Sequence, residues 1–125
     1  MVPALVTFLW LCFAHCIADY GLQSNFMAIA KSRHTDLGKQ FWKTVLSAHS
    51  ATHGGSVAIV LHLLCGLSWN VVTIFGVAEF IVHFVIDFCK CEDWYNFHVD
   101  QALHIGCKVL WVAIVFTMLT PVVIH

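Results

Sequence analysis

Four long apolar stretches dominate this chain, at about residues 2–20, 41–64, 69–89 and 99–120. A helix that crosses a bilayer needs roughly 20 mostly apolar residues at about 1.5 Å each, so each stretch is long enough to span. Of the 125 residues, 60% are hydrophobic and only 10% are charged, far fewer than in a soluble domain of this size. The sequence therefore predicts an all-α protein, a transmembrane up-down four-helix bundle that forms one integral membrane domain over residues 1–125.

Basic residues are concentrated beside two of the predicted loops. Five of the six Lys and Arg residues lie in or next to the first and third loops: Lys31, Arg33, Lys39, Lys43 and Lys90. The first loop, residues 23–40, is expected to be a polar interfacial segment. Because cytoplasmic loops of membrane proteins are enriched in Lys and Arg, we expect a multi-pass protein of the inner (cytoplasmic) membrane with both termini outward.

Three further features narrow the class of protein. The first apolar stretch lacks a basic leader and a small-residue cleavage site, so we expect a retained helix and not a signal peptide. The six cysteines lie in or beside apolar segments, which indicates reduced packing thiols. No basic aromatic cluster suggests nucleic-acid binding, so the lipid bilayer is the expected partner. The sequence leaves the oligomeric state open, a homo-oligomer included.

Each apolar stretch carries two potential metal ligands four residues apart. The pairs are His15 with Asp19, His49 with His53, His83 with Asp87, and Asp100 with His104. Residues at this spacing lie on one face of a helix, one turn apart. In an up-down bundle all four pairs fall in the half of the membrane nearest the first and third loops, with His53 deepest and Asp100 shallowest. We expect a funnel-shaped site a turn or two below the cytoplasmic surface.

A metal site is the interpretation that the set favours. An isolated ionisable group in a membrane costs on the order of 3 kcal/mol, so these eight side chains should face inward and satisfy one another. Imidazole nitrogens with carboxylates that ligate or orient them suit a divalent metal ion, Zn²⁺ above all, and helical bundles build such sites from facing helices. A polar core that only fixes helix packing is the structural alternative for the same residues.

Other polar residues have subsidiary roles in this hypothesis. Asp19, Asp100 and Glu79 are the candidate catalytic groups, and Glu79, one turn before His83, is alternatively a residue that orients a ligand or packs helices. Gln23, Lys31, Lys90 and Gln101 are the candidate substrate-binding residues. Lys108, about two turns inside the fourth stretch, is expected to snorkel or to pair with a carboxylate. His34, His62, His98 and His125 are expected not to be ligands.

The motifs together resemble a known family. They are His15-x-x-Ala18-Asp19-Tyr20-x-x-Gln23, His49-x-x-x-His53, His83-Phe84-x-Ile86-Asp87-x-x-Lys90 and Asp100-Gln101-x-x-His104. The chain resembles a domain-of-unknown-function family of small four-helix membrane proteins from bacteria and phages. This resemblance implies a four-helix membrane protein whose matched polar residues are the functional set. The pattern is also distantly similar to membrane-bound metal-dependent hydrolases, a likeness of arrangement and not of established function.

We therefore expect a membrane-embedded metal-dependent hydrolase that acts on a lipid-like or phosphorylated substrate. The first alternative is a metal or proton carrier, which requires a polar path beyond the site. The second is a haem-binding electron carrier. The three pairs that contain an aspartate disfavour it, because a haem site held by two histidines needs no carboxylate in each pair. The third is an interaction protein of a phage or bacterial membrane whose polar core is structural.

Overall fold

The computed structural model of the chain describes residues 2–119, and these form helices and no strand. The described helices are α1 (Ala4–Cys16), α2 (Asn25–Ala30), α3 (Asp36–Cys65), α4 (Trp69–Cys91) and α5 (Phe97–Ile114). Two π-helical segments extend the first and last helices of the chain: η1 (Ile17–Gly21) follows α1 directly, and η2 (Val115–Leu119) follows α5. The prediction of an all-α chain is confirmed.

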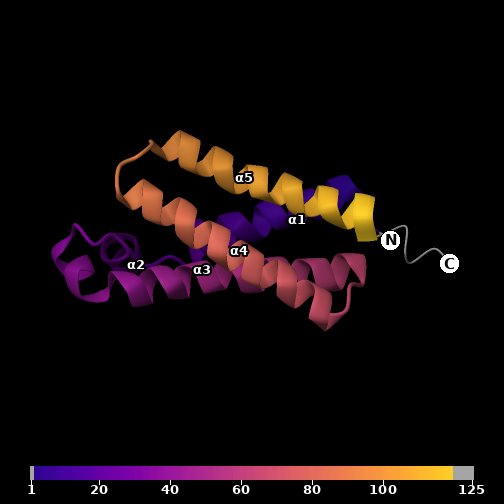
Figure 1. Cartoon of the computed structure of the whole chain (residues 1–125), viewed down its shortest axis with the longest axis horizontal. Coiled ribbons are helices and arrows are strands. Elements are labelled where there is room, and N and C mark those ends of the chain that lie inside the picture. Colours follow the sequence, from indigo (N-terminus) through magenta and orange to yellow (C-terminus); the bar gives the residue numbers. More distant parts are fainter. Residues whose placement is uncertain (1, 120–125) are drawn as a thin grey trace.

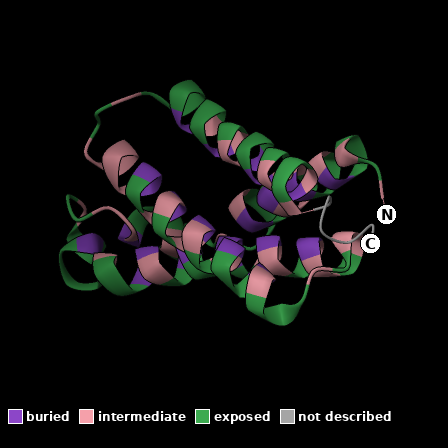
Figure 2. Cartoon of the chain, turned by 45° about the vertical axis from the view of Figure 1, so that its right-hand side comes forward, coloured by how far each residue is buried: buried purple, intermediate pink, exposed green. Residues whose placement is uncertain are grey.

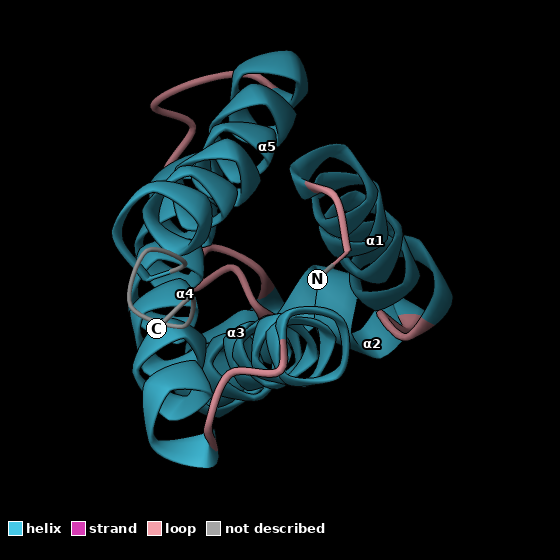
Figure 3. Cartoon of the chain, turned by 90° about the vertical axis from the view of Figure 1, so that its right-hand side faces the viewer, coloured by secondary structure: helices cyan, strands magenta, loops and turns pink. Residues whose placement is uncertain are grey.

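The long helices run back and forth along one axis (Figure 1). The α2 segment and the α4–α5 loop lie at one end of the molecule, and the start of α1 and the α3–α4 turn lie at the other (Figure 1). We call the first of these the loop end. Viewed along the axis, α1, α3, α4 and α5 surround a common centre (Figure 3). The most extensive packing is between α3 and α4, and α1 contacts both α3 and α5.

Three segments are long and apolar enough to cross a membrane. They are Ala4–Gly21, Trp69–Cys91 and Phe97–Leu119, which correspond to the first, third and fourth predicted spans. The last predicted span ends at residue 120, which lies outside the described residues. Helix α3 contains 30 residues, but its three histidines and the charges in its first turns lower its mean hydropathy, so composition alone does not place it among the spans.

Polar capping explains where the loop-end helices begin. The Thr35 side chain accepts a 2.9 Å hydrogen bond from the backbone N–H of Gly38, so α3 starts at Asp36, five residues before the predicted span. Ser24 and Asn96 cap α2 and α5 in the same way. Such caps satisfy N–H groups that the first turn of a helix leaves unbonded. The predicted interfacial segment 23–40 is thus the short α2, a turn and the start of α3.

Exposed residues run along the outward faces of all the long helices (Figure 2), and many of them are apolar. Large apolar side chains point outward along the helices, with Leu63 72% exposed and Ile74 69% exposed. Charged Glu79 and Lys108 are each only 1% exposed. Ionisable residues of membrane proteins face the interior of the bundle in this manner, because lipid cannot solvate them.

The interior has an apolar half and a polar half. The apolar half is a cluster of buried side chains from α1, α3, α4, α5 and η2, away from the loop end: Leu11, Val57, Leu61, Val72, Phe75, Trp111 and Val115. Buried histidines and carboxylates fill the half nearer the loop end. The division follows the sequence, since the polar pairs occupy the same half of every long helix.

Candidate metal centre

All eight predicted ligands meet in one buried cluster. Seven of them are buried, and the eighth, Asp19, has a side chain only 10% exposed. Their ligand atoms form three overlapping groups, each with all atoms within 4.8 Å of one another and each able to hold a metal ion. The groups are Asp19 with His49, His53 and His83; His15 with His83 and His104; and Asp87 with Asp100 and His104. We refer to the eight side chains as the His/Asp cluster.

Five imidazole rings form the centre of the cluster. His83 lies between two stacked neighbours, with ring centroids 3.6 Å from His53 and 4.2 Å from His104. His15 joins from α1, its Nδ1 3.3 Å from Nδ1 of His53. The ring of His49 lies 5.1 Å from that of His83. Side chains from all four long helices therefore converge on one volume.

One oxygen of Asp19 lies close to two histidines and is within hydrogen-bond geometry of His53. Its Oδ1 lies 3.1 Å from Nε2 of His53 and 3.3 Å from Nε2 of His49. Its Oδ2 accepts a 3.1 Å hydrogen bond from the amide of Gln101. Asp19 stands in the π-helical segment η1, whose wider turn changes the direction of the side chain relative to a regular helix. Such π-helical turns are frequent at functional sites, and the helical spacing in the sequence did not predict this one.

Asp87 links the cluster to the loop end. Its Oδ1 lies 3.2 Å from Nε2 of His104, and its Oδ2 accepts a 2.7 Å hydrogen bond from the Lys31 ammonium. Burial alone would lower the pKa of Lys31, but the neighbouring Asp87 carboxylate raises it above its usual range. Lys31 therefore offsets part of the negative charge of the cluster. When the histidines are neutral, the three cluster carboxylates and the Lys31 ammonium together have a net charge of −2.

Several buried ligand atoms have no hydrogen-bond partner within the described residues. They are Nε2 of His49, both ring nitrogens of His83, Nδ1 of His104 and Oδ1 of Asp100. Leaving a buried polar atom unsatisfied costs about 1–3 kcal/mol. Atoms of this kind, close to carboxylates within a buried cluster of histidines, fit the chemistry of a bound cation, which satisfies them together.

A second polar layer lies below the cluster, toward the apolar half. Glu79 accepts hydrogen bonds from the Lys108 ammonium and, at 2.6 Å, from the indole N–H of Trp111. Its Oε1 is also 3.7 Å from Nδ1 of His83. The predicted pairing of Lys108 with a carboxylate is confirmed. The sequence does not predict the hydrogen bond from Trp111, because an aromatic residue in an apolar stretch usually indicates helix packing alone.

A polar cavity of about 380 Å³ opens at the loop end. The three cluster carboxylates line it: Asp19, Asp87 and Asp100. All four candidate substrate-binding residues line it as well: Gln23, Lys31, Lys90 and Gln101. Gln101 also donates to Asp100 at 3.1 Å and contacts Nε2 of His15 at 3.3 Å. Tyr20, a matched residue of the first motif, lines the same cavity.

The remaining described histidines lie outside the His/Asp cluster, although His34 lines the polar cavity. His62 contacts the carbonyl oxygen of Leu67 through Nδ1 at 2.8 Å, His34 lies 3.0 Å from Glu92, and His98 is exposed at the start of α5. None of these three belongs to a group of candidate ligands among residues 2–119. His125 lies outside the described residues.

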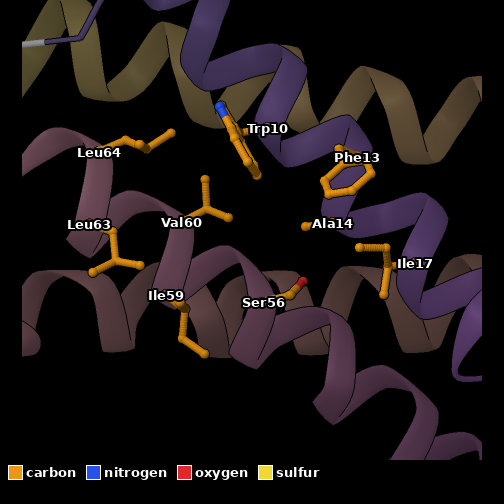
Figure 4. A pocket seen from close by; sticks show the side chains of 9 residues that line it. All are labelled: Trp10, Phe13, Ala14, Ile17, Ser56, Ile59, Val60, Leu63 and Leu64. Atoms are coloured by element: carbon orange, nitrogen blue, oxygen red, sulfur yellow. The ribbon is translucent and has the colours of Figure 1, made fainter.

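An apolar groove on the outer surface is separate from the polar cavity. Trp10 and Phe13 of α1 and Ile17 of η1 face Ile59, Val60 and Leu63 of α3 across it (Figure 4). Ser56 supplies the one side-chain hydroxyl among its lining residues. The groove therefore offers hydrophobic contact and no ligand chemistry.

The amino-acid sequence that carries the His/Asp cluster is similar to one known protein family. A family model described as "Protein of unknown function (DUF3307)" matches residues 6–124. The chain belongs to this family. The predicted membership of a domain-of-unknown-function family is confirmed, and the match includes all eight cluster residues. No match was found among curated proteins or solved structures.

Proposed function

We propose that this protein is a membrane-embedded, metal-dependent hydrolase whose metal is held by the His/Asp cluster. The observation that supports this most directly is the set of unpartnered buried nitrogens on His49 and His83, close to the carboxylates of Asp19 and Asp87. A core that served packing alone would be expected to satisfy these atoms internally. Zinc is the preferred ion, because the donors are imidazole nitrogens and carboxylate oxygens.

In this proposal α3 is the fourth transmembrane helix of an up-down bundle. Its polar residues His49 and His53 are buried against the other helices, while Ile59 and Leu63 are exposed on its outer face. A polar stripe directed at the bundle interior lowers the hydropathy of a helix without exposing charge to lipid. The basic residues gathered at the loop end orient that end, and with it the cavity, toward the cytoplasm.

The chain's own residues supply the base and position the substrate. A divalent ion in such a site lowers the pKa of a water and polarises the bond to be cleaved. Asp100 lines the cavity and has one unpartnered oxygen, so we assign it as the base, with Asp19 as the alternative. Both oxygens of Glu79 are engaged by Lys108 and Trp111, so its influence on the reaction passes through His83.

The hydrolytic step then balances within the site. The water oxygen forms a bond to the phosphorus or carbonyl carbon, and the bond from that atom to the leaving group breaks. Asp100 takes the proton from the water and returns it to the leaving group. Lys31, Lys90, Gln23 and Gln101 line the entrance and hold an anionic or hydrogen-bonding group of a lipid-like substrate from the cytoplasmic leaflet.

A carrier that moves metal ions or protons across the membrane is the main rival. It would need a polar path from the cluster to the opposite end of the bundle. Beyond Glu79 and Lys108 the described interior is the apolar cluster that contains Leu11, Leu61 and Val72, together with the buried hydroxyl residue Thr7. That apolar packing favours a site that opens at one end.

The test is hydrolysis by detergent-purified protein, stripped of metal and then resupplied with zinc or manganese. A panel of phosphate monoesters, phosphodiesters, carboxylic esters and amides in mixed micelles covers the substrate classes. We expect metal-dependent turnover of at least one class that His49→Ala and Asp87→Asn abolish. His98→Ala, which removes an exposed histidine outside the cluster, is the matched control and should retain activity. Metal binding without turnover of any class would contradict the enzyme assignment.

A further inference from the structure

We infer that the His/Asp cluster holds two metal ions at distinct positions, bridged by Asp87, and that its substrate is a phosphate ester. This inference rests on the proposed function and specifies its metal stoichiometry and substrate class. It follows from how the eight ligands are distributed, since one ion uses only three to five of them.

The deep position has four ligands from three helical segments. Asp19 comes from η1, His49 and His53 come from α3, and His83 comes from α4. Their ligand atoms lie within 4.8 Å of one another. Three nitrogens and one oxygen complete a tetrahedral zinc site, so this position needs no ligand from solvent.

The shallow position has three ligands and opens on the cavity. Asp87, Asp100 and His104 form it, and both aspartates line the cavity at the loop end. Three protein ligands with a free coordination position are typical of catalytic metal sites. The unpartnered Oδ1 of Asp100 is a ligand in this arrangement, so Asp19, the alternative base, takes the proton from water through its Oδ2.

Asp87 faces both positions with different oxygens. Its Oδ1 lies 3.2 Å from Nε2 of His104, in the shallow group. Its Oδ2 lies 3.5 Å from Nε2 of His49 and 3.8 Å from Nε2 of His83, in the deep group. A carboxylate that presents one oxygen to each of two ligand sets is placed as a bridge. The third candidate group adds only His15, since His83 and His104 already belong to the other two.

Charge then indicates the substrate class. Two divalent ions add four positive charges to three carboxylates, and the Lys31 ammonium adds a fifth, so the loaded site is cationic and attracts an anion. Pairs of metal ions in phosphatases and nucleases stabilise the attacking and leaving oxygens of phosphoryl transfer. With Lys31 and Lys90 on the cavity wall, a phosphate ester fits the site better than a neutral ester or an amide.

The stoichiometry of bound metal tests the inference. Purified protein is stripped with chelator, equilibrated with Mn²⁺ or Zn²⁺, and analysed for metal per chain, with Mn²⁺ samples examined by electron paramagnetic resonance. We expect two ions per wild-type chain and a spin-coupled Mn²⁺ pair. His53→Ala should remove the deep ion, Asp100→Asn the shallow ion, and each variant should retain one uncoupled ion. Circular dichroism and size-exclusion chromatography establish that the variants are folded.

The outcomes separate the inference from the proposed function. One ion per wild-type chain, lost in both variants, overturns the two-metal inference and leaves a mononuclear hydrolase. No bound ion in folded wild-type protein overturns both. Two ions with turnover of carboxylic esters or amides and none of phosphate esters overturns the substrate class alone.

Discussion

Gly54 of α3 and Gly76 of α4 face each other in close backbone contact where the two helices cross. A Cβ built on Gly54 would lie 2.4 Å from the carbonyl oxygen of Gly76, and one on Gly76 would lie 3.0 Å from that of Gly54. Small residues allow membrane helices to approach this closely. Because Gly54 directly follows His53, the position of this crossing also determines where His49 and His53 lie in the cluster.

Gly54→Ala should therefore destabilise the protein. The added methyl group meets backbone, which cannot move aside as a flexible side chain can, and we expect a loss of about 1–3 kcal/mol in unfolding free energy. Gly55→Ala is the matched control, because nothing lies within 4 Å of its Cβ, and it should be neutral or slightly stabilising. Titration with a denaturing detergent, followed by circular dichroism, measures both. Equal effects in the two variants would mean that the crossing is not close.

The buried Glu79–Lys108 pair gives a second prediction. Lys108→Met leaves the Glu79 carboxylate buried with only Trp111 as a donor, and breaking a buried pair costs about 3–5 kcal/mol. In Glu79→Gln/Lys108→Met no charge is left uncompensated, so the double variant should be more stable than the sum of the single effects predicts. A double-mutant cycle of unfolding free energies measures this coupling. Additive single effects would show that the two side chains do not interact.

Helical spacing and short loops made much of the candidate site predictable. The pairs His15–Asp19, His49–His53, His83–Asp87 and Asp100–His104 repeat at one-turn spacing, and antiparallel neighbours bring them to the same level. The burial of Lys108 against a carboxylate followed from the cost of a lone charge in an apolar stretch.

Other features depend on packing that no local pattern encodes. The π-helical turn that carries Asp19 breaks the regular spacing, and its residues Ile17–Gly21 have no distinctive composition. The Lys31–Asp87 ion pair joins residues 56 positions apart and depends on how α2 folds back over the bundle. The same holds for the hydrogen bond from Trp111 to Glu79.

Lys31 should stabilise the metal-free protein more than the metal-bound protein. Without metal, the ammonium is the cationic partner of Asp87, so Lys31→Met should lower stability by roughly 2 kcal/mol, less than a fully buried pair because Lys31 is 18% exposed. A bound cation replaces that charge, and the difference from wild type should shrink. Thermal unfolding with chelator and with excess zinc measures the effect.

Lys90→Met is the control for that experiment, because Lys90 carries the same charge on the wall of the same cavity. It should have little effect in either condition. A Lys31→Met defect of the same size with and without metal would argue against competition between Lys31 and metal for Asp87.

Glu92 gives a prediction about pH at the loop end. It accepts 2.8 and 2.6 Å hydrogen bonds from Arg33 and lies 3.0 Å from His34. The hydrogen bonds from Arg33 hold the pKa of Glu92 below its ordinary value of 4.5. The contact therefore stabilises the fold fully above pH 4.5, and this stabilisation is lost as the pH falls through the lowered pKa.

Nuclear magnetic resonance of protein labelled with ¹³C-glutamate measures this titration directly. The chain has only two glutamates, Glu79 and Glu92, so assignment needs one variant. We expect the Glu92 carboxyl to titrate below 4.5 in wild type and closer to 4.5 in Arg33→Gln. Titration at an unchanged pKa in Arg33→Gln would contradict the ion pair.

X-ray absorption at the zinc K-edge tests the central claim, that the His/Asp cluster is a metal centre, most directly. All six cysteines are free thiols and the cluster contains none of them, so the two kinds of ligand are distinguishable. We predict scattering from nitrogen and oxygen at about 2.0–2.2 Å, several histidine rings around the metal, and no sulfur. Sulfur at about 2.3 Å, or zinc retained in full after His49→Ala and Asp87→Asn, would place the metal elsewhere and contradict the account.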